Sequence, residues 1–288
     1  MNASVMHWDA LVDAPTLAAQ LDDPQLRLFD ARFSLADPDA GRLGYGQSHL
    51  PGAVYADLNL DLSDLRKAGQ GRHPLPDDEV FARKLGRWGV SPAHQVVIYD
   101  AADGSMAAAR FWWLLKLLGH ERVAVLDGGL AAWRAAGLPE TPEVKTQAEQ
   151  APYPASFDRS RVVPAEAVRE RIECDSGWLV DVRAAERFRG DVEPIDPVAG
   201  HVPGAVNRPF ALNLRDGRFK PGEELREELT TLLSGRAPSD MVLMCGSGVS
   251  ACHLLLAFEH AGLHGARLYP GSWSGWISDP ARPIARGP

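Results

Sequence analysis

The sequence predicts an α/β protein made of two tandem copies of one domain, each a parallel sheet flanked by helices. Three observations support this. Short apolar segments of strand length alternate with segments of helical apolar spacing along the 288 residues, as in β–α–β units. Blocks of sequence from the first half return in the same order in the second half. A proline-rich, charged stretch without apolar periodicity separates the halves. We expect one domain at residues 1–145, a linker at 146–157 and a second domain at 158–288.

The repeat consists of four pairs of blocks. They are 28–32 with 179–183, 49–54 with 201–206, 96–100 with 241–245, and 126–133 with 269–276. The first pair shares an apolar strand that ends in Asp-x-Arg, and the second pair shares His-x-Pro-Gly-Ala. Four matched blocks in one order indicate a duplicated architecture.

Several elements can be placed from their apolar patterns. In the first copy, residues 80–88 have helical spacing up to Gly89, and residues 107–118 form a strongly apolar helix that ends at Gly119. In the second copy, residues 241–244 are expected to form a buried parallel strand, followed by a helix over 250–259. Open parallel sheets bind ligands beyond the carboxyl ends of their strands. The residue after 244 therefore lies where a site is expected.

Composition excludes several classes of protein. Hydrophobic content of 45% and charged content of 24% are those of a soluble globular protein. The formal net charge of −8 argues against nucleic-acid binding. No apolar run approaches the roughly 18 residues of a membrane span, and the N-terminus lacks the pattern of a signal peptide.

The three cysteines form no paired framework, so we expect a reducing, cytoplasmic location. No Cys/His cluster has zinc-ligand spacing, and neither a metal nor an organic cofactor is expected.

Cys245 directly follows the strand predicted at 241–244. The residues after it are Gly246, Ser247, Gly248, Val249 and Ser250. The free N–H groups of a glycine-rich turn and of a helix start stabilise an anion such as a thiolate, which is a nucleophile. The prediction is a catalytic cysteine in an anion cradle, and the alternative is a buried cysteine at a strand end. The first copy carries Asp100 at the matching position, so only the second copy is expected to perform thiol chemistry.

These motifs together resemble the two-domain rhodanese superfamily of thiosulfate and 3-mercaptopyruvate sulfurtransferases. The resemblance covers nearly the whole chain and implies an inactive N-terminal and a catalytic C-terminal rhodanese-like domain. It also implies that Cys245 carries sulfur as a persulfide, taken from 3-mercaptopyruvate or thiosulfate and passed to cyanide or a thiol. A thioredoxin-like protein is a candidate acceptor, whereas nucleic acid and membranes are not expected partners.

The resemblance also implies how the donor binds. The loop after Cys245 has no charged side chain, which is similar to the mercaptopyruvate type, although thiosulfate remains the alternative. Arg187 matches an arginine that holds the donor's carboxylate, together with Gly246, Gly248, Val249 and Ser250 of the loop. A second arginine is usual about nine residues later, where this chain has Asp196. Arg189 is a possible replacement.

His73 matches a family histidine that pairs with a serine of the reactive loop, here Ser247. A histidine at this place relays a proton near neutral pH, and the alternative is a histidine in a surface loop. Three residues upstream are candidates to support it: Asn59, Asp61 and Asp64. Arg72, the neighbour of His73, either binds an anion or is solvated.

Duplicated polar residues are expected to be structural, because the inactive copy retains them. They are Asp30 with Arg32, Asp181 with Arg183, and His49 with His201. Cys252 is expected to pack in the core, with a resolving thiol as the alternative.

Two other functions are alternatives for a cysteine in such a loop. A cysteine phosphatase needs an arginine six residues after the cysteine, where this chain has Ala251. A persulfide carrier without turnover is the remaining alternative. The oligomeric state and the physiological acceptor are not encoded in any motif.

Overall fold

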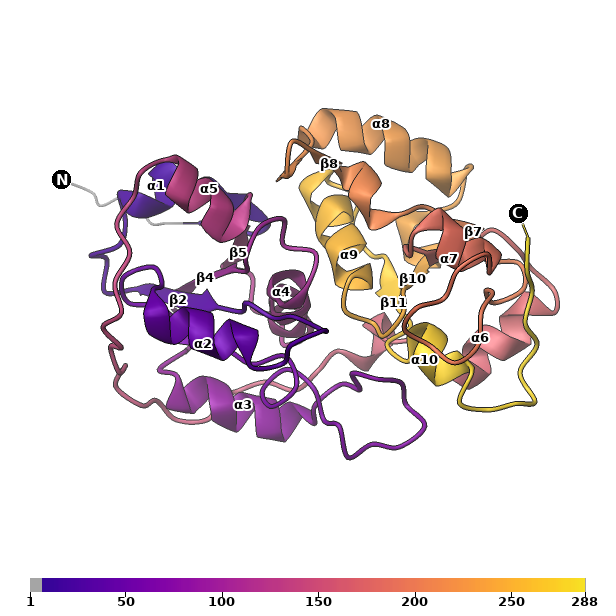
Figure 1. Cartoon of the computed structure of the whole chain (residues 1–288), viewed down its shortest axis with the longest axis horizontal. Coiled ribbons are helices and arrows are strands. Elements are labelled where there is room, and N and C mark those ends of the chain that lie inside the picture. Colours follow the sequence, from indigo (N-terminus) through magenta and orange to yellow (C-terminus); the bar gives the residue numbers. More distant parts are fainter. Residues whose placement is uncertain (1–6, 288) are drawn as a thin grey trace. The chain divides into compact units, whose positions relative to one another are not determined.

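The computed structural model describes residues 7–287, which form two compact units (Figure 1). The first unit contains the residues up to Leu62 together with Pro76–Phe157. The second unit contains Ser63–Leu75 and the chain from Asp158 onward. The short segment Ser63–Leu75 thus belongs with the C-terminal half of the chain. The domain limits predicted from the sequence, 1–145 and 158–288 with a linker at 146–157, stay a prediction.

The first unit is a parallel sheet with strand order β1-β5-β4-β2-β3. Its elements are β1 (Leu11–Val12), α1 (Ala14–Ala18), β2 (Leu26–Asp30), α2 (Ala40–Gln47), β3 (Val54–Tyr55), α3 (Asp78–Arg87), β4 (Gln95–Tyr99), α4 (Ala107–Leu117), β5 (Val123–Leu126) and α5 (Gly129–Ala135). Figure 1 shows α1 and α5 on one side of the strands and α3 on the other.

Alternation along β2 divides the core of the first unit into two layers. Leu28 packs in a cluster with Leu17 of α1 and Trp133 of α5. Its neighbour Phe29 points to the opposite face, where its ring lies 4.9 Å from that of Phe111 in α4. Because both faces are covered, the central strand β4 is buried along its whole length.

The second unit repeats this plan with strand order β11-β10-β6-β7, again parallel. Its helices and strands are α6 (Ala165–Ile172), β6 (Leu179–Asp181), α7 (Ala185–Arg189), β7 (Val206–Asn207), β8 (Leu214–Arg215), β9 (Arg218–Phe219), α8 (Gly222–Leu233), β10 (Val242–Met244), α9 (Ala251–His260), β11 (Arg267–Leu268) and α10 (Ser272–Trp276). Three short 3₁₀ helices span Arg159–Arg161, Phe210–Asn213 and Pro238–Asp240. Strands β8 and β9 form a separate antiparallel hairpin.

Matched backbone hydrogen bonds confirm the sequence repeat. In the first unit, the N–H of Leu130 donates to the carbonyl of Asp100 at 3.0 Å. In the second, the N–H of Trp273 donates to the carbonyl of Cys245 at 2.9 Å. The turn after the last strand therefore holds the end of the central strand in the same way in both units.

The duplicated Asp-x-Arg pairs are structural clamps. Arg183 donates from Nε and Nη2 to the carboxylate of Asp181 and from Nη2 to the carbonyl of Gly200 at 2.7 Å. Arg32 binds Asp30 in the same pattern. Asp30, Asp181 and Arg183 are buried and Arg32 is partly buried. Through the carbonyls of Ser48 and Gly200, each pair ties a distant loop to the end of an inner strand.

The duplicated histidines also have structural contacts. His49 donates from Nδ1 to the carbonyl of Tyr45 at 2.8 Å, and His201 does the same to Phe188 at 2.8 Å. Each imidazole also stacks on the ring of the residue that it binds. Both contacts fit the turn role that was predicted for these histidines.

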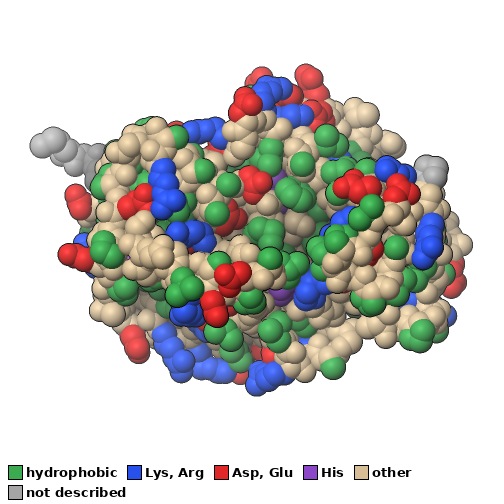
Figure 2. Space-filling model, in the orientation of Figure 1, with side chains coloured by type: hydrophobic (Ala, Val, Ile, Leu, Met, Phe, Trp, Pro, Cys, Tyr) green, Lys and Arg blue, Asp and Glu red, His purple; other side chains and the backbone are tan. Residues whose placement is uncertain are grey.

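None of the helices in the described part of the chain is long and apolar enough to cross a membrane. Acidic and basic side chains are interspersed on the face shown in Figure 2.

Candidate active site

Cys245 lies at the carboxyl end of β10, where the sequence placed it. Its side chain is buried, and its Sγ accepts a hydrogen bond from the N–H of Gly248 at 3.1 Å. Its own N–H donates to Oγ of Ser272 at 3.0 Å. The sulfur is therefore held in a tight turn that directs a backbone donor toward it.

Gly248 is required for this turn because of its backbone conformation. Its φ is +75°, and a Cβ at this position would overlap the carbonyl oxygen of Pro270. A side chain is disfavoured on both grounds. Glycine at this position allows the N–H to face Sγ.

The rest of the loop leads into α9. Val249 is buried, and Ser250 is the residue from which the helix begins at Ala251. The first N–H groups of a helix have no acceptor within the helix, and they carry its positive dipole end. The loop and the helix start thus form a region that favours an anion on or near Cys245.

No sequence motif pointed to Ser272, which contacts the reactive loop. It has a left-handed backbone, with φ of +51°, and its Oγ bridges the N–H of Cys245 and the carbonyl of Tyr269. Gly129 occupies the matching position in the first unit with φ of +52°. The aligned glycine was the signal that this position needs an unusual backbone.

His73 and Ser247 are brought together, as predicted. Nδ1 of His73 lies 2.8 Å from Oγ of Ser247, and both residues are buried. Among the three candidate supports for His73, the carboxylate of Asp64 binds the guanidinium of Arg66, and Asp61 binds Lys84. The N–H of Asn59 donates to the carboxylate of Asp57.

Arg187 projects from the short helix α7 into a cluster of charges. Its guanidinium donates to Glu193 from Nε at 3.2 Å and from Nη2 at 2.7 Å, and Nη2 also lies 3.3 Å from Oδ2 of Asp196. Burial alone would raise the pKa of the Glu193 carboxyl, but hydrogen bonds from Arg187 and backbone N–H groups outweigh it and lower that pKa. Arg187 is thereby fixed in one orientation.

Arg72 completes this cluster from the segment Ser63–Leu75. Its Nη1 lies 2.6 Å from Oδ1 of Asp196. A Cβ built on Gly246 would lie 3.2 Å from Nη2 of Arg72 and 3.8 Å from Nη2 of Arg187. Two guanidinium groups therefore flank the residue that follows Cys245.

Arg189 does not join the cluster. Its Nε donates to the exposed carboxylate of Asp191 at 2.8 Å. Asp196, which stands where the resemblance led us to expect a second arginine, binds the guanidinium of Arg72 instead.

The first unit shows what the matching turn holds without a thiol. The carboxylate of Asp100 accepts hydrogen bonds from the N–H groups of Ala102 at 3.2 Å and Gly104 at 3.0 Å. Burial raises the pKa of Asp100 to about 6. The turn thus directs backbone donors at the side chain that ends the central strand in both units.

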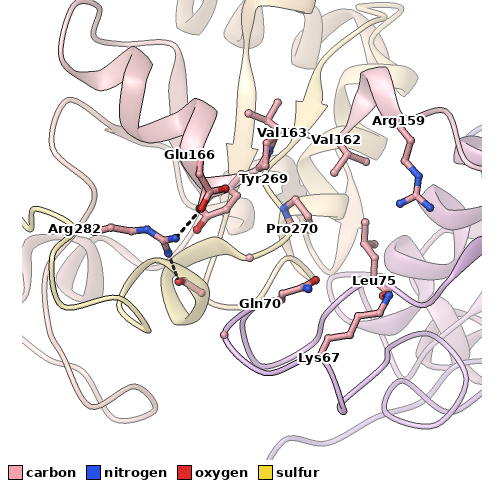
Figure 3. A pocket seen from close by; sticks show the side chains of 15 residues that line it. Lys67, Gln70, Leu75, Arg159, Val162, Val163, Glu166, Tyr269, Pro270 and Arg282 are labelled. Atoms are coloured by element: carbon pink, nitrogen blue, oxygen red, sulfur yellow. Dashed lines mark hydrogen bonds and ion pairs between the residues drawn. The ribbon is translucent and has the colours of Figure 1, made fainter.

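A cavity of about 440 Å³ is lined in part by Pro270 and Gly271, which precede α10 (Figure 3). Its wall includes Glu166 and Arg282, which form an ion pair at 3.2 Å. Cys245 does not line it. Within residues 7–287, no group of three or more His, Cys, Asp or Glu side chains is placed to hold a metal ion.

Comparison with known proteins agrees with this geometry. The rhodanese-like domain family matches the chain twice, at residues 13–136 and 164–279. A probable 3-mercaptopyruvate sulfurtransferase of Pseudomonas aeruginosa is 49% identical over 284 residues, which cover 96% of this chain and 98% of that protein. A putative thiosulfate sulfurtransferase, SseB of Mycobacterium tuberculosis, is 41% identical over 286 residues, which cover 96% and 97% of the two chains.

A solved structure is similar over the same span. The crystal structure of SseA from Escherichia coli, a 3-mercaptopyruvate sulfotransferase, superposes with a TM-score of 0.77 at 32% identity. The match covers 93% of this chain and all of that one. With two matched domains, a thiol at the end of the second central strand and full-length relatives of this kind, the chain belongs to the two-domain rhodanese-like sulfurtransferases.

Proposed function

We propose that this sulfurtransferase takes a sulfur atom from 3-mercaptopyruvate, carries it as a persulfide on Cys245 and passes it to a thiol or to cyanide. The proposal rests mainly on one observation. The buried Sγ of Cys245 accepts a hydrogen bond from the N–H of Gly248 at 3.1 Å. Gly246, the residue after Cys245, is flanked by the guanidinium groups of Arg72 and Arg187. A nucleophile, an anion cradle and a carboxylate-binding group thus lie within one small site.

In the first half-reaction, the thiolate of Cys245 attacks the thiol sulfur of mercaptopyruvate. A sulfur–sulfur bond forms while the carbon–sulfur bond breaks, and the electron pair of the broken bond leaves with carbon as the enolate of pyruvate. The guanidinium of Arg187 holds the donor's carboxylate during this step. The enolate then takes up one proton and becomes pyruvate.

The paired side chains of His73 and Ser247 supply that proton. Their separation of 2.8 Å is that of a hydrogen bond, and a histidine exchanges protons readily near neutral pH. The hydroxyl of Ser247 donates its proton to the enolate, and Nδ1 of His73 donates a proton to Oγ of Ser247 in turn. Both residues come from the second unit, so the relay is assembled within one compact body.

In the second half-reaction, an acceptor thiolate attacks the outer sulfur of the persulfide. Cys245 leaves as a thiolate, which is stabilised by the N–H groups of residues 246–250, and the acceptor becomes a persulfide. Cyanide reacts in the same way to give thiocyanate. We propose a small thioredoxin-like protein as the cellular acceptor. We also propose a cytoplasmic location, because all three cysteines are free thiols.

The first experiment compares kcat/KM for the two donors with cyanide as the acceptor. We expect mercaptopyruvate to be preferred by about a hundredfold, which corresponds to about 2.7 kcal/mol of transition-state preference. A hundredfold higher kcat/KM for thiosulfate than for mercaptopyruvate would instead favour the activity named for the Mycobacterium tuberculosis relative. A protein that loads one sulfur and then stalls with every acceptor would be a carrier, and the proposal would be wrong.

A further inference from the structure

The carboxylate of Asp196 bridges the two guanidinium groups beside the reactive loop. Its Oδ1 lies 2.6 Å from Arg72 and its Oδ2 lies 3.3 Å from Arg187. The side chain of Asp196 is 3% exposed, whereas those of Arg72 and Arg187 are 26% and 16% exposed. The two cations are therefore the accessible part of this cluster, and the carboxylate is the covered part.

The cluster lies where the anionic end of a donor must be placed. A Cβ on Gly246 would be 3.8 Å from Oδ2 of Asp196, and about as close to the guanidinium groups of Arg72 and Arg187. Gly246 directly follows Cys245, so a small donor whose sulfur contacts Sγ brings its negative charge within a few ångströms of all three side chains. At such distances a single charge matters for binding.

The formal charges of the cluster balance. Arg72 and Arg187 are matched by Glu193 and Asp196, and the adjoining buried pair of Arg183 with Asp181 adds no net charge. A donor therefore meets well-oriented N–H groups but no excess of positive charge. Oriented donors suit a carboxylate with one negative charge. A dianion needs more compensation, and it would gain twice as much as a monoanion from each added positive charge.

We propose that Asp196 is a specificity-determining residue, which selects a monoanionic carboxylate donor over a dianionic sulfur oxyanion by neutralising the guanidinium of Arg72. The inference rests on the proposed function, because both donors must deliver sulfur to Cys245. It concerns only the charge of the donor that the site accepts.

The test measures the ratio of kcat/KM for thiosulfate to that for mercaptopyruvate. Asp196→Asn removes one negative charge while keeping the shape of the side chain. One charge at about 5 Å in a partly solvated site is worth about a tenfold change. We expect the ratio to rise about tenfold in Asp196→Asn, mainly through KM for thiosulfate, and to stay at the wild-type value in Asp196→Glu, which keeps the charge.

A second pair of variants checks the charge argument independently. Arg72→Gln leaves the carboxylate of Asp196 without its closest cation, so the ratio should fall. The double variant with Arg72→Gln and Asp196→Asn restores the charge balance, so its ratio should return to within about threefold of wild type. A merely structural role would lower kcat/KM for both donors alike.

An unchanged ratio in an active Asp196→Asn enzyme would overturn the inference, and so would a double variant that shifts as far as Asp196→Asn. If Asp196→Asn does not fold, Arg72→Gln still tests the inference, because the ratio of kcat/KM for thiosulfate to that for mercaptopyruvate should then fall. A ratio that does not fall in Arg72→Gln would overturn it. Failure of the wild-type protein to turn over either donor would refute the proposed function itself, which is a different result.

Discussion

The two glycines of the reactive loop should respond very differently to alanine. Gly248 has φ of +75°, and a Cβ there would overlap the backbone oxygen of Pro270. Gly246 is not among the residues with positive φ, and its Cβ would meet the flexible end of Arg72 at 3.2 Å. Only one of the two substitutions therefore strains the backbone.

The left-handed conformation costs a non-glycine residue about 1–2 kcal/mol, and the overlap with a fixed carbonyl adds to this. We expect Gly248→Ala to lose about 2–3 kcal/mol of unfolding free energy, whereas Gly246→Ala should lose less than about 1 kcal/mol. Because the strained turn also moves the N–H away from Sγ, the rate of sulfur loading in Gly248→Ala should fall at least tenfold, or about 1.4 kcal/mol.

Denaturation monitored by circular dichroism gives the first quantity, and single-turnover loading followed by mass spectrometry gives the second. The matched variant Gly246→Ala controls for the added methyl group. Equal stability and equal loading rates in the two variants would refute the assignment of the cradle to the turn at Gly248.

Three further predictions concern the proton relay and the buried titratable groups. Ser247→Ala should lower kcat about tenfold or more with little change in KM, whereas Ser250→Ala, at the start of α9, should not; equal effects would contradict the relay. Burial raises the pKa of Asp100 to about 6. The folded protein must therefore ionise a buried carboxyl as the pH rises from about 4 to 6, and it loses stability over this range. Asp100→Asn should therefore be more stable than wild type at about pH 8, by up to about 3 kcal/mol, with the difference vanishing near pH 4; a pH-independent difference would argue against this. Burial lowers the pKa of His120 to about 4, so stability should be full above about pH 6.5 and fall between there and pH 4. His120→Gln should flatten that fall in acid titrations followed by circular dichroism, and an unchanged slope would exclude His120 as its source.

Local pattern was sufficient for the architecture and for the position of the proposed nucleophile. The apolar runs and the four repeated blocks predicted two parallel sheets, because a period-2 or continuous apolar pattern reports burial directly. Cys245 was located because the strand end, the glycines and the helix start are adjacent in sequence. The pairing of His73 with Ser247 came from the family resemblance.

The partners of the arginines were not predictable in this way. Arg72 and Asp196 are 124 residues apart, and nothing in the local pattern indicates which distant carboxylate a guanidinium will meet. Arg187 and Arg189 are two residues apart on α7, so they face different sides of the helix. The structure decides between them: Arg187 points to the loop and Arg189 to the surface pair with Asp191.

The central claim is that Cys245 carries the sulfur. Intact-protein mass spectrometry after treatment with mercaptopyruvate measures this directly. The wild-type chain and Cys174→Ser, which alters an exposed cysteine, should each gain the mass of one sulfur atom, and cyanide should remove it. Cys245→Ser should gain none. A sulfur adduct that persists in Cys245→Ser, or one that is lost in Cys174→Ser, would contradict the account.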